Sequence, residues 1–274
     1  MDYVVVQGGK VPALGFGTWE LLGEDCRKAV LSALDLGYRH IDTAQIYMNE
    51  DKVGRAIQES GVKREDLFLT TKVWLSNLAY GDVLKSVGES LRKLRTDYVD
   101  LLLIHWPYDK IPLSETLGAM NKLQEAGKAV HVGVSNFPVE WLMKAQEASK
   151  TPVFCDQVEY HPFLSQKTLL DYCQKDHILL TAYSPLLRGG VAGNEKLSEI
   201  GGKYEKTAFQ VALRWLIQQK NVAAIPKAKS RKHQQENIGI FDFELTAREM
   251  REIFALASGR RETNPPFAPG WDVD

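Results

Sequence analysis

One lysine lies inside a run of residues that carries no other charge. Lys72 belongs to the sequence Leu-Phe-Leu-Thr-Thr-Lys-Val-Trp, whose apolar and β-branched residues are typical of a buried strand. A buried ammonium needs a partner, because burial without one costs several kcal/mol or removes the proton. We expect that partner to be Asp42, which ends another apolar run in His-Ile-Asp-Thr-Ala. The alternatives are a structural ion pair and a lysine whose ammonium reaches solvent.

Two further side chains could complete an acid–base site with this pair. Tyr47 follows Asp42 by five residues. Its phenol, with an ordinary pKa of about 10, could act as a general acid if Lys72 stabilised the phenolate. His105 ends the run Leu-Ile-His-Trp-Pro. Alone, each would more often be a packed tyrosine or a hydrogen-bonded histidine, so the signal lies in the four residue types together.

Several other chemistries lack their motifs. The run that begins at Gly15, Gly-Phe-Gly-Thr-Trp-Glu, has no third glycine of a dinucleotide fingerprint. No tyrosine is followed four residues later by a lysine, the pair of short-chain dehydrogenases. Ser135, in Gly-Val-Ser-Asn-Phe, lacks the second flanking glycine of a hydrolase nucleophile. No His-Glu-x-x-His or Cys/His spacing predicts a metal site.

The elements that position these residues alternate regularly along the chain. A hairpin is expected at residues 3–6 and 10–13, and amphipathic helices at 25–36 and 207–219. Gly37 and Gly127 follow helical patterns where a left-handed cap is common. Short apolar runs that are typical of strands buried on both faces lie at 14–17, 38–42, 67–73, 98–104, 130–134, 153–158, 178–182 and 222–225.

Eight strands, each followed by a helix, predict an α/β fold of the (β/α)₈ TIM-barrel type. We expect one barrel domain over residues 1–274, with the N-terminal hairpin and a C-terminal extra helix and loop, the tail being 258–274. A doubly wound sheet is the structural alternative, weakened by the lack of a linker near the midpoint. Barrel chemistry belongs at the carboxyl ends of the strands. Those ends carry polar residues: Thr18 and Trp19, Asp42, Lys72, His105, Ser135 and Asn136, Gln157, Tyr183 and Ser184, and Lys227.

Composition excludes several classes of protein. The chain has 274 residues, with 34 Lys and Arg against 35 Asp and Glu, so a dedicated nucleic-acid binder is not expected. No run of 18 apolar residues and no secretory signal is present. The three cysteines, Cys26, Cys155 and Cys173, are widely spaced and indicate reduced, buried thiols. We expect a cytoplasmic monomer that acts on a small molecule, without nucleic-acid or membrane partners.

Several motifs together resemble the aldo-keto reductase family. The run Gly-Tyr-Arg-His-Ile-Asp-Thr-Ala from Gly37, with Ile-Tyr at 46–47 and Asn-Glu at 49–50, is similar to the family's first signature. Thr-Lys-Val-Trp, Ile-His-Trp-Pro, Gly-Val-Ser-Asn-Phe, Gln-Val-Glu-Tyr-His-Pro, Tyr-Ser-Pro-Leu and Ile-Pro-Lys follow in order. The resemblance runs from about Val11 to Leu256. In length the chain resembles the short microbial members, such as the diketogluconic acid reductases and protozoan prostaglandin F synthases.

The resemblance implies NAD(P)H-dependent reduction of carbonyl groups. It makes Tyr47 the general acid, with a pKa lowered by Lys72 and Asp42, and makes His105 the residue that orients the carbonyl. The resemblance also implies that Ser135, Asn136 and Gln157 hold the cofactor's carboxamide and that Tyr183 stacks on its nicotinamide ring. Further cofactor contacts are expected from Thr18 and Trp19, and along the pyrophosphate from Ser184, Pro185, Leu186, Arg188 and Gly189.

The chain departs from the family where the cofactor's 2′-phosphate is expected. Family members often carry a serine and an arginine at the positions of Ala228 and His233, while Lys227, Glu236 and Asn237 are retained. A cluster of Lys227, Lys229, Arg231 and Lys232 is either a phosphate site or a solvated helix start. We predict that NADPH/NADP⁺ is preferred and that NADH is tolerated more than in relatives with the arginine.

The resemblance places Trp19, Ile46, Trp74 and Trp106 around the substrate, beside His105. The tail holds three prolines and Trp271, and we expect an irregular flap near the pocket, with disorder as the alternative. A short tail and a short segment after His105 suggest an open pocket for small aldehydes, ketones or sugar-like dicarbonyls. Two other functions stay open: a Schiff-base aldolase that uses Lys72, and a non-catalytic nucleotide-binding member of the fold.

Overall fold

The strands form one parallel sheet that closes on itself. The computed structural model describes residues 2–274, and the sheet runs in the order β10-β9-β8-β7-β6-β5-β4-β3. Its strands are β3 (Phe16–Gly17), β4 (His40–Asp42), β5 (Phe68–Val73), β6 (Val99–Ile104), β7 (Ala129–Ser135), β8 (Cys155–Glu159), β9 (Leu179–Tyr183) and β10 (Val222–Ala224). Leu14 pairs in parallel with Ala224, and the Gly15 amide donates to the Ala224 carbonyl at 2.8 Å. These contacts join the two ends of the sheet, so the predicted barrel is confirmed and the doubly wound alternative is wrong.

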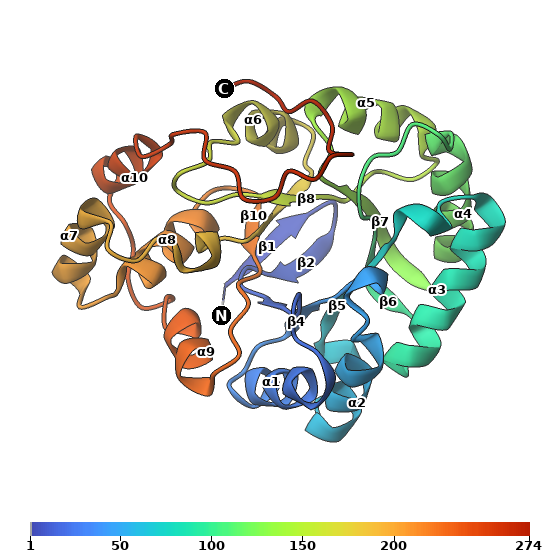
Figure 1. The fold of residues 1–274 in the computed structure, drawn as a ribbon, viewed down its shortest axis with the longest axis horizontal. Helices are drawn as coiled ribbons and strands as arrows, with labels where there is room; N and C mark the ends of the chain where they lie inside the picture. Colours follow the sequence, from blue (N-terminus) through green and yellow to red (C-terminus); the bar gives the residue numbers. More distant parts are fainter. Residues whose placement is uncertain (1) are drawn as a thin grey trace.

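A layer of helices surrounds the sheet (Figure 1). They are α1 (Gly23–Asp35), α2 (Glu50–Ser60), α3 (Tyr80–Leu94), α4 (Leu113–Glu125), α5 (Val139–Ala148), α6 (Lys167–Lys175), α7 (Glu195–Tyr204), α8 (Ala208–Ile217), α9 (Arg231–Ile238) and α10 (Ala247–Phe254). Short 3₁₀ turns are η1 (Gln45–Tyr47), η2 (Arg64–Asp66), η3 (Leu75–Asn77) and η4 (Leu187–Gly189). Gly37 and Gly127, at φ +97° and +69°, end α1 and α4 as expected. The sequence analysis did not include α7, and α10 is the expected extra helix.

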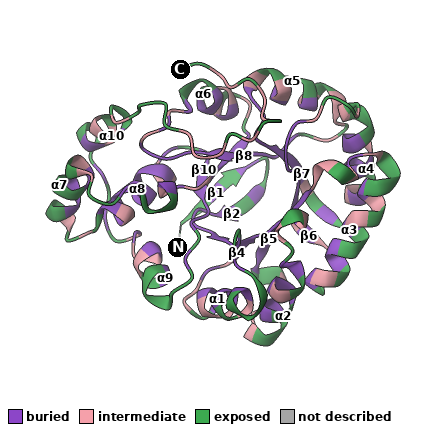
Figure 2. Ribbon diagram, in the orientation of Figure 1, coloured by how far each residue is buried: buried purple, intermediate pink, exposed green. Residues whose placement is uncertain are grey.

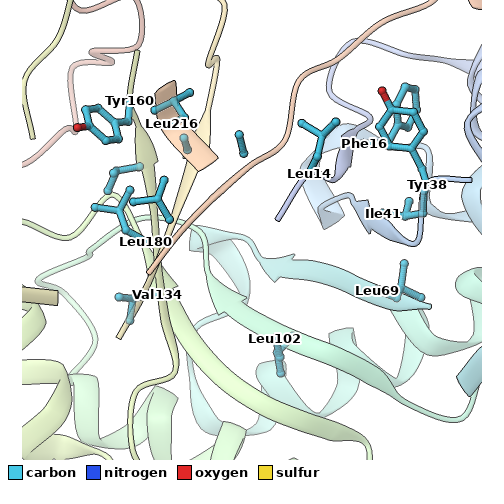
Figure 3. Packing of buried hydrophobic residues seen from close by; sticks show 14 of the residues in the cluster. Leu14, Phe16, Tyr38, Ile41, Leu69, Leu102, Val134, Tyr160, Leu180 and Leu216 are labelled. Atoms are coloured by element: carbon cyan, nitrogen blue, oxygen red, sulfur yellow. The ribbon is translucent and has the colours of Figure 1, made fainter. Parts of the chain in front are cut away.

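Side chains along each strand point alternately toward the surrounding helices and toward the interior of the barrel. Ile41 and Leu69 belong to the large apolar cluster between sheet and helices, part of which is shown in Figure 3. Asp42 follows Ile41 by one residue, and Lys72 follows Leu69 by three. Because successive side chains of a strand point to opposite faces, Asp42 and Lys72 point into the barrel. Figure 2 shows the strands of the eight-stranded sheet almost wholly buried, while the outer faces of the helices are exposed.

The hairpin closes the barrel at the amino-terminal ends of its strands. It consists of β1 (Tyr3–Val6) and β2 (Gly9–Pro12), paired antiparallel, and is seen through the barrel in Figure 1. Val4, Val6 and Val11 are buried in a second apolar cluster with barrel residues such as Phe68 and Leu101. The bottom of the barrel is therefore packed with side chains, which leaves the opposite end for chemistry.

The tail is an irregular segment that lies along the carboxyl-terminal end of the barrel, near α5 and α6 (Figure 1). The carboxylate of Glu159 accepts hydrogen bonds from the amides of Glu262 and Thr263, both at 2.8 Å. Asp272 accepts from the Val139 amide at 3.0 Å, at the start of α5. In the same way, the Asp274 side chain accepts from the first two amides of α6, at 2.9 and 2.7 Å. The tail is thus the expected flap: the Glu159 carboxylate of the barrel holds two tail amides, and amides at the starts of α5 and α6 hold two tail carboxylates.

Candidate active site

The carboxyl ends of the strands surround a cavity of about 980 Å³. That volume is at the upper end of the range for ligand sites, so it can hold more than a small substrate. Its wall includes the residues predicted for the cofactor and the substrate: Thr18, Trp19, Asp42, Ile46, Trp74, His105, Trp106, Ser135, Asn136, Gln157, Tyr183, Ser184, Pro185, Leu186, Arg188, Gly189, Lys227, Ala228, His233, Glu236 and Asn237. Tyr47 also lines the cavity, whereas Lys72 lies beneath it.

Lys72 and Asp42 form a fully buried ion pair at the floor of the cavity. The Lys72 ammonium donates to Asp42 Oδ1 at 2.5 Å and to the Thr43 carbonyl at 3.0 Å. Asp42 Oδ2 in turn accepts from the Gln157 amide at 2.7 Å. Burial lowers the pKa of the Lys72 ammonium, and the Asp42 carboxylate opposes that shift. The carboxylate partner that the sequence predicted is therefore in place, and it keeps the lysine charged.

Tyr47 stands directly above this pair. The 3₁₀ turn η1 follows β4 and brings the phenol oxygen to 3.4 Å from the Lys72 nitrogen. Burial raises the pKa of the Tyr47 phenol well above its ordinary value, and the Asp42 charge raises it further. The net direction is opposite to the expected lowering, because loss of water around a phenolate outweighs the attraction of a lysine that Asp42 already neutralises. The phenol is thus protonated at neutral pH and able to donate.

His105 lies between Tyr47 and the aromatic side of the cavity. Its ring centre is 5.6 Å from that of Tyr47 and 5.2 Å from that of Trp74, both edge to face. Burial, reinforced by the Lys72 charge, lowers the pKa of the imidazole well below its ordinary value. Within residues 2–274, His105 Nδ1 has no hydrogen-bond partner. The ring is therefore neutral and acts on the cavity as a dipole and not as a cation.

A chain of hydrogen bonds organises the wall beside His105. Asn136, with a left-handed φ of 65°, donates to the His105 carbonyl at 3.0 Å and accepts from the Tyr183 hydroxyl at 2.8 Å. Ser135 donates to the Gln157 carbonyl at 2.7 Å. Amide and hydroxyl groups from β7, β8 and β9 thus meet at one place, which fits the polar edge of a carboxamide.

Three of the four predicted basic residues at the other end of the cavity are each paired with an acid. The Lys227 ammonium lies 3.5 Å from the Glu20 carboxylate. Lys229 and Arg231 form pairs with acids of α1, both at 2.7 Å. Three of the four cations in the predicted cluster therefore face carboxylates, so the cluster is less positive than the sequence suggested. His233 lines the same region of the cavity, near the start of α9.

An aromatic corner forms the substrate side of the cavity. Phe267 of the tail packs edge to face against Trp74 and Trp106, with ring centres 6.1 and 5.5 Å apart. The sequence analysis did not identify Phe267, because the tail has no periodicity that would place it. It also missed Gln45, whose side-chain oxygen accepts from the Trp74 amide at 3.0 Å and so anchors this wall.

A metal site, a membrane span and a disulfide have no support in the described residues. Across residues 2–274 no group of three or more His, Cys, Asp or Glu side chains is arranged to hold a metal ion. Within the same described range, none of the helices combines the length and the apolar character needed to span a bilayer. The three cysteines are free thiols, and all are buried.

A (β/α)₈ barrel with a tyrosine, a histidine and a buried lysine–aspartate pair at its mouth defines a class of oxidoreductase that reduces carbonyl groups. Comparison with known proteins gives the same result. The sequence profile of the Aldo/keto reductase family matches residues 13–258, and the chain belongs to that family. The protein therefore reduces carbonyl compounds and uses a nicotinamide cofactor.

Named relatives are similar over almost the whole chain. The 9,11-endoperoxide prostaglandin H2 reductase of Trypanosoma cruzi is 42% identical over 267 residues, covering 95% of this chain and 94% of its own. The glyoxal reductase of Bacillus subtilis is 43% identical over 255 residues, covering 93% and 92%. A crystal structure provisionally named as a 2,5-diketo-D-gluconic acid reductase B superposes with a TM-score of 0.97 at 46% identity, covering 100% of this chain and 98% of that one.

Proposed function

We propose that the protein reduces small aldehydes and ketones with NADPH and that Tyr47 is the general acid. The observation that carries the proposal is the position of the Tyr47 phenol, which faces the cavity 3.4 Å from a fully buried ammonium. The bound cofactor supplies the hydride that adds to the carbonyl carbon. Tyr47 supplies the proton to the carbonyl oxygen, so that an alcohol results.

The buried pair supports this role of Tyr47 in two ways. A raised pKa keeps the phenol protonated until the oxygen of the substrate gains charge. The Lys72 ammonium then stabilises the phenolate that remains, because charge interactions are strong in a dry site. Asp42 holds Lys72 in its charged form, and a neutral His105 can direct an N–H group at the carbonyl oxygen.

The cavity wall supports a nicotinamide dinucleotide. The groups around Asn136 suit the carboxamide, and Tyr183 offers a ring beside it. The helix α9 begins near Lys227 and His233, so its amino end and the lysine suit a phosphate. Because a single histidine replaces the family's arginine, we infer a preference for NADPH that is smaller than in relatives with the arginine.

The substrates we infer are small aldehydes, ketones and dicarbonyls. One relative is named for glyoxal and another for a prostaglandin endoperoxide, although their sequence identities to this chain are almost equal. The names of relatives therefore do not single out one substrate. The aromatic corner of Trp74, Trp106 and Phe267 offers apolar contact without demanding a particular polar group. A broad range of aldehydes is therefore expected.

The Schiff-base alternative has no support from the position of Lys72. A Schiff base needs a lysine nitrogen that is uncharged and open to the substrate. The side chain of Lys72 has 0% exposure, and its nitrogen is hydrogen-bonded to Asp42, Thr43 and Tyr47. The complete acid–base set likewise argues against a non-catalytic nucleotide-binding role.

We also infer that one chain suffices for activity and that the protein is cytoplasmic. The predicted cofactor and substrate residues of one chain line a single cavity, which supports a functional monomer. Free, buried thiols are typical of a reducing compartment.

The test is the loss of absorbance at 340 nm when NADPH is mixed with a panel of aldehydes. Tyr47→Phe removes the proton donor, so its rate should fall by about 100-fold or more. Tyr80→Phe, which changes an exposed tyrosine on α3, is the matched control and should keep the wild-type rate. Equal rates for wild type and Tyr47→Phe would contradict the proposed role.

A further inference from the structure

Glu20 is an acidic residue in the wall of the cavity, at the end where the cations lie. It belongs to the loop between β3 and α1, and its carboxylate is 3.5 Å from the Lys227 ammonium. The two side chains are 52% and 39% exposed, so both can reach a bound ligand. Lys227 thus already has a negatively charged partner, supplied by a residue 207 positions earlier in the chain.

The loop that carries Glu20 is firmly held. The buried Asn49 side chain donates to the carbonyls of Thr18 and Leu21 at 2.8 and 2.9 Å, and the Leu21 amide donates to the Thr18 carbonyl at 3.0 Å. Glu20 itself has a left-handed φ of 62°, an uncommon conformation for a non-glycine residue. The surrounding hydrogen bonds therefore hold the loop in which Glu20 adopts this conformation, with its carboxylate 3.5 Å from the Lys227 ammonium.

Glu20 differs from the two other acids that face this region. The helices α1 and α9 lie side by side (Figure 1), and Asp25 and Asp35 of α1 pair with Lys229 and Arg231. Neither acid is part of the cavity wall, whereas Glu20 is. Glu236 also lines the cavity, but its carboxylate accepts from the Thr207 hydroxyl at 2.7 Å. Glu20 is thus the carboxylate that a phosphate on Lys227 must meet.

We propose that Glu20 is a cofactor-selectivity residue, whose carboxylate competes with the 2′-phosphate of NADPH for Lys227. The inference rests on the proposed function, in which the adenosine end of the cofactor lies against this region. A 2′-phosphate carries nearly two negative charges and must displace or share the pairing with Glu20. The 2′-hydroxyl of NADH leaves the pair intact. Glu20 therefore weakens the binding of NADPH but not that of NADH. It brings the Kd values of the two cofactors closer together.

The experiment is a binding titration, which does not depend on turnover. Trp19, Trp74 and Trp106 line the cavity, so tryptophan fluorescence reports the Kd of NADPH and of NADH. Glu20→Gln keeps the shape and removes the charge. Because the charges of Glu20 and a 2′-phosphate interact weakly in the high dielectric of an exposed site, the Kd of NADPH should fall about threefold to tenfold. The Kd of NADH should change less than about twofold, and Glu20→Lys should shift the ratio further in the same direction.

Asp35→Asn is the matched control, because it removes an equal charge from a pair outside the cavity wall. It should leave the ratio of the two Kd values within about twofold of wild type, since an exposed charge at that distance is screened by salt. The inference is overturned if Glu20→Gln leaves the ratio of the two Kd values unchanged, including the case in which both Kd values fall by the same factor. A wild-type protein that binds NADPH and NADH, with an unchanged ratio in Glu20→Gln, would contradict the selectivity role alone. A wild-type protein that binds neither would contradict the proposed function, and this inference with it.

Discussion

At the scale of single residues, the site depends on the opposite effects of burial on an acid and a base. Burial raises the pKa of the Tyr47 phenol and lowers that of the His105 imidazole. Both shifts hold the neutral form, in which the phenol keeps the proton that it can give to a carbonyl oxygen and the imidazole keeps one N–H group as a hydrogen-bond donor. Among the four acid–base residues, Lys72 and Asp42 carry the charges, and each neutralises the other.

These two shifts predict the pH dependence of carbonyl reduction. A phenol with a raised pKa stays protonated even at a pH above 10.0, its ordinary pKa. An imidazole with a lowered pKa stays neutral even at a pH below 6.5, its ordinary pKa. Initial rates with saturating NADPH should therefore give a flat kcat/KM between about pH 6 and pH 9. A clear inflection near 6.5 would show that His105 gains a proton there and would contradict this assignment.

The buried ion pair predicts different outcomes for one and two substitutions. Lys72→Met leaves the Asp42 carboxylate buried without its ammonium, which should lower the free energy of unfolding by about 3–5 kcal/mol. Asp42→Asn together with Lys72→Met removes both charges and should restore most of that stability. Turnover should stay at least about 100-fold low in both, because Tyr47 lacks its cation. Urea unfolding and the 340 nm assay measure the two effects, and wild-type turnover in the double variant would refute the role of Lys72.

Residue types in motifs were sufficient to predict that Asp42, Tyr47, Lys72 and His105 lie together, because strand ends of a barrel meet at one mouth. The side chains that shape the cavity from distant segments were not predictable in this way. Glu20 reaches Lys227 across 207 positions, and Phe267 reaches Trp74 only because the tail folds back. Neither contact has a periodic signal, since both depend on where loops run over the barrel.

At the scale of elements, the apolar runs predicted each strand of the sheet to within a few residues. The amphipathic patterns did the same for α1 and α8, whose buried faces repeat at helical spacing. The helix α7 was missed, because only Leu197, Ile200 and Gly201 of it are buried, too few for a clear stripe. The tail could not be predicted in detail, since backbone contacts determine its path.

The tail is held at Glu159, which predicts what happens when that charge is removed. Glu159→Gln weakens the two hydrogen bonds from the amides of Glu262 and Thr263, because charge-assisted bonds are roughly twice as strong as neutral ones. Amide exchange in the peptide 258–274 should become about tenfold faster. Glu140→Gln, at an exposed position of α5, is the control and should not change it. Equal exchange in Glu159→Gln and wild type would contradict this anchoring.

At the scale of the whole molecule, the first and last parts of the chain are both tied to the barrel. The segment before β3 pairs with β10 and closes the sheet, and the tail carboxylates Asp272 and Asp274 accept from the first turns of α5 and α6. These links join regions more than 100 positions apart. We propose on this basis that residues 1–274 form a single domain.

A single domain predicts one cooperative unfolding transition. Far-ultraviolet circular dichroism reports the helices, and tryptophan fluorescence reports the mouth of the barrel, where Trp74 and Trp106 lie. The two probes should give the same urea midpoint. Two separate midpoints would show that part of the chain folds independently.

The central claim is that Tyr47 supplies the proton while hydride is transferred, and single-turnover kinetics test it most directly. Enzyme with bound NADPH is mixed with excess aldehyde, and the decay of reduced cofactor is followed within one turnover. In Tyr47→Phe this decay should be at least about 100-fold slower than in wild type, with the Kd of NADPH changed less than about twofold. Decay at the wild-type rate in Tyr47→Phe with NADPH bound would contradict the account.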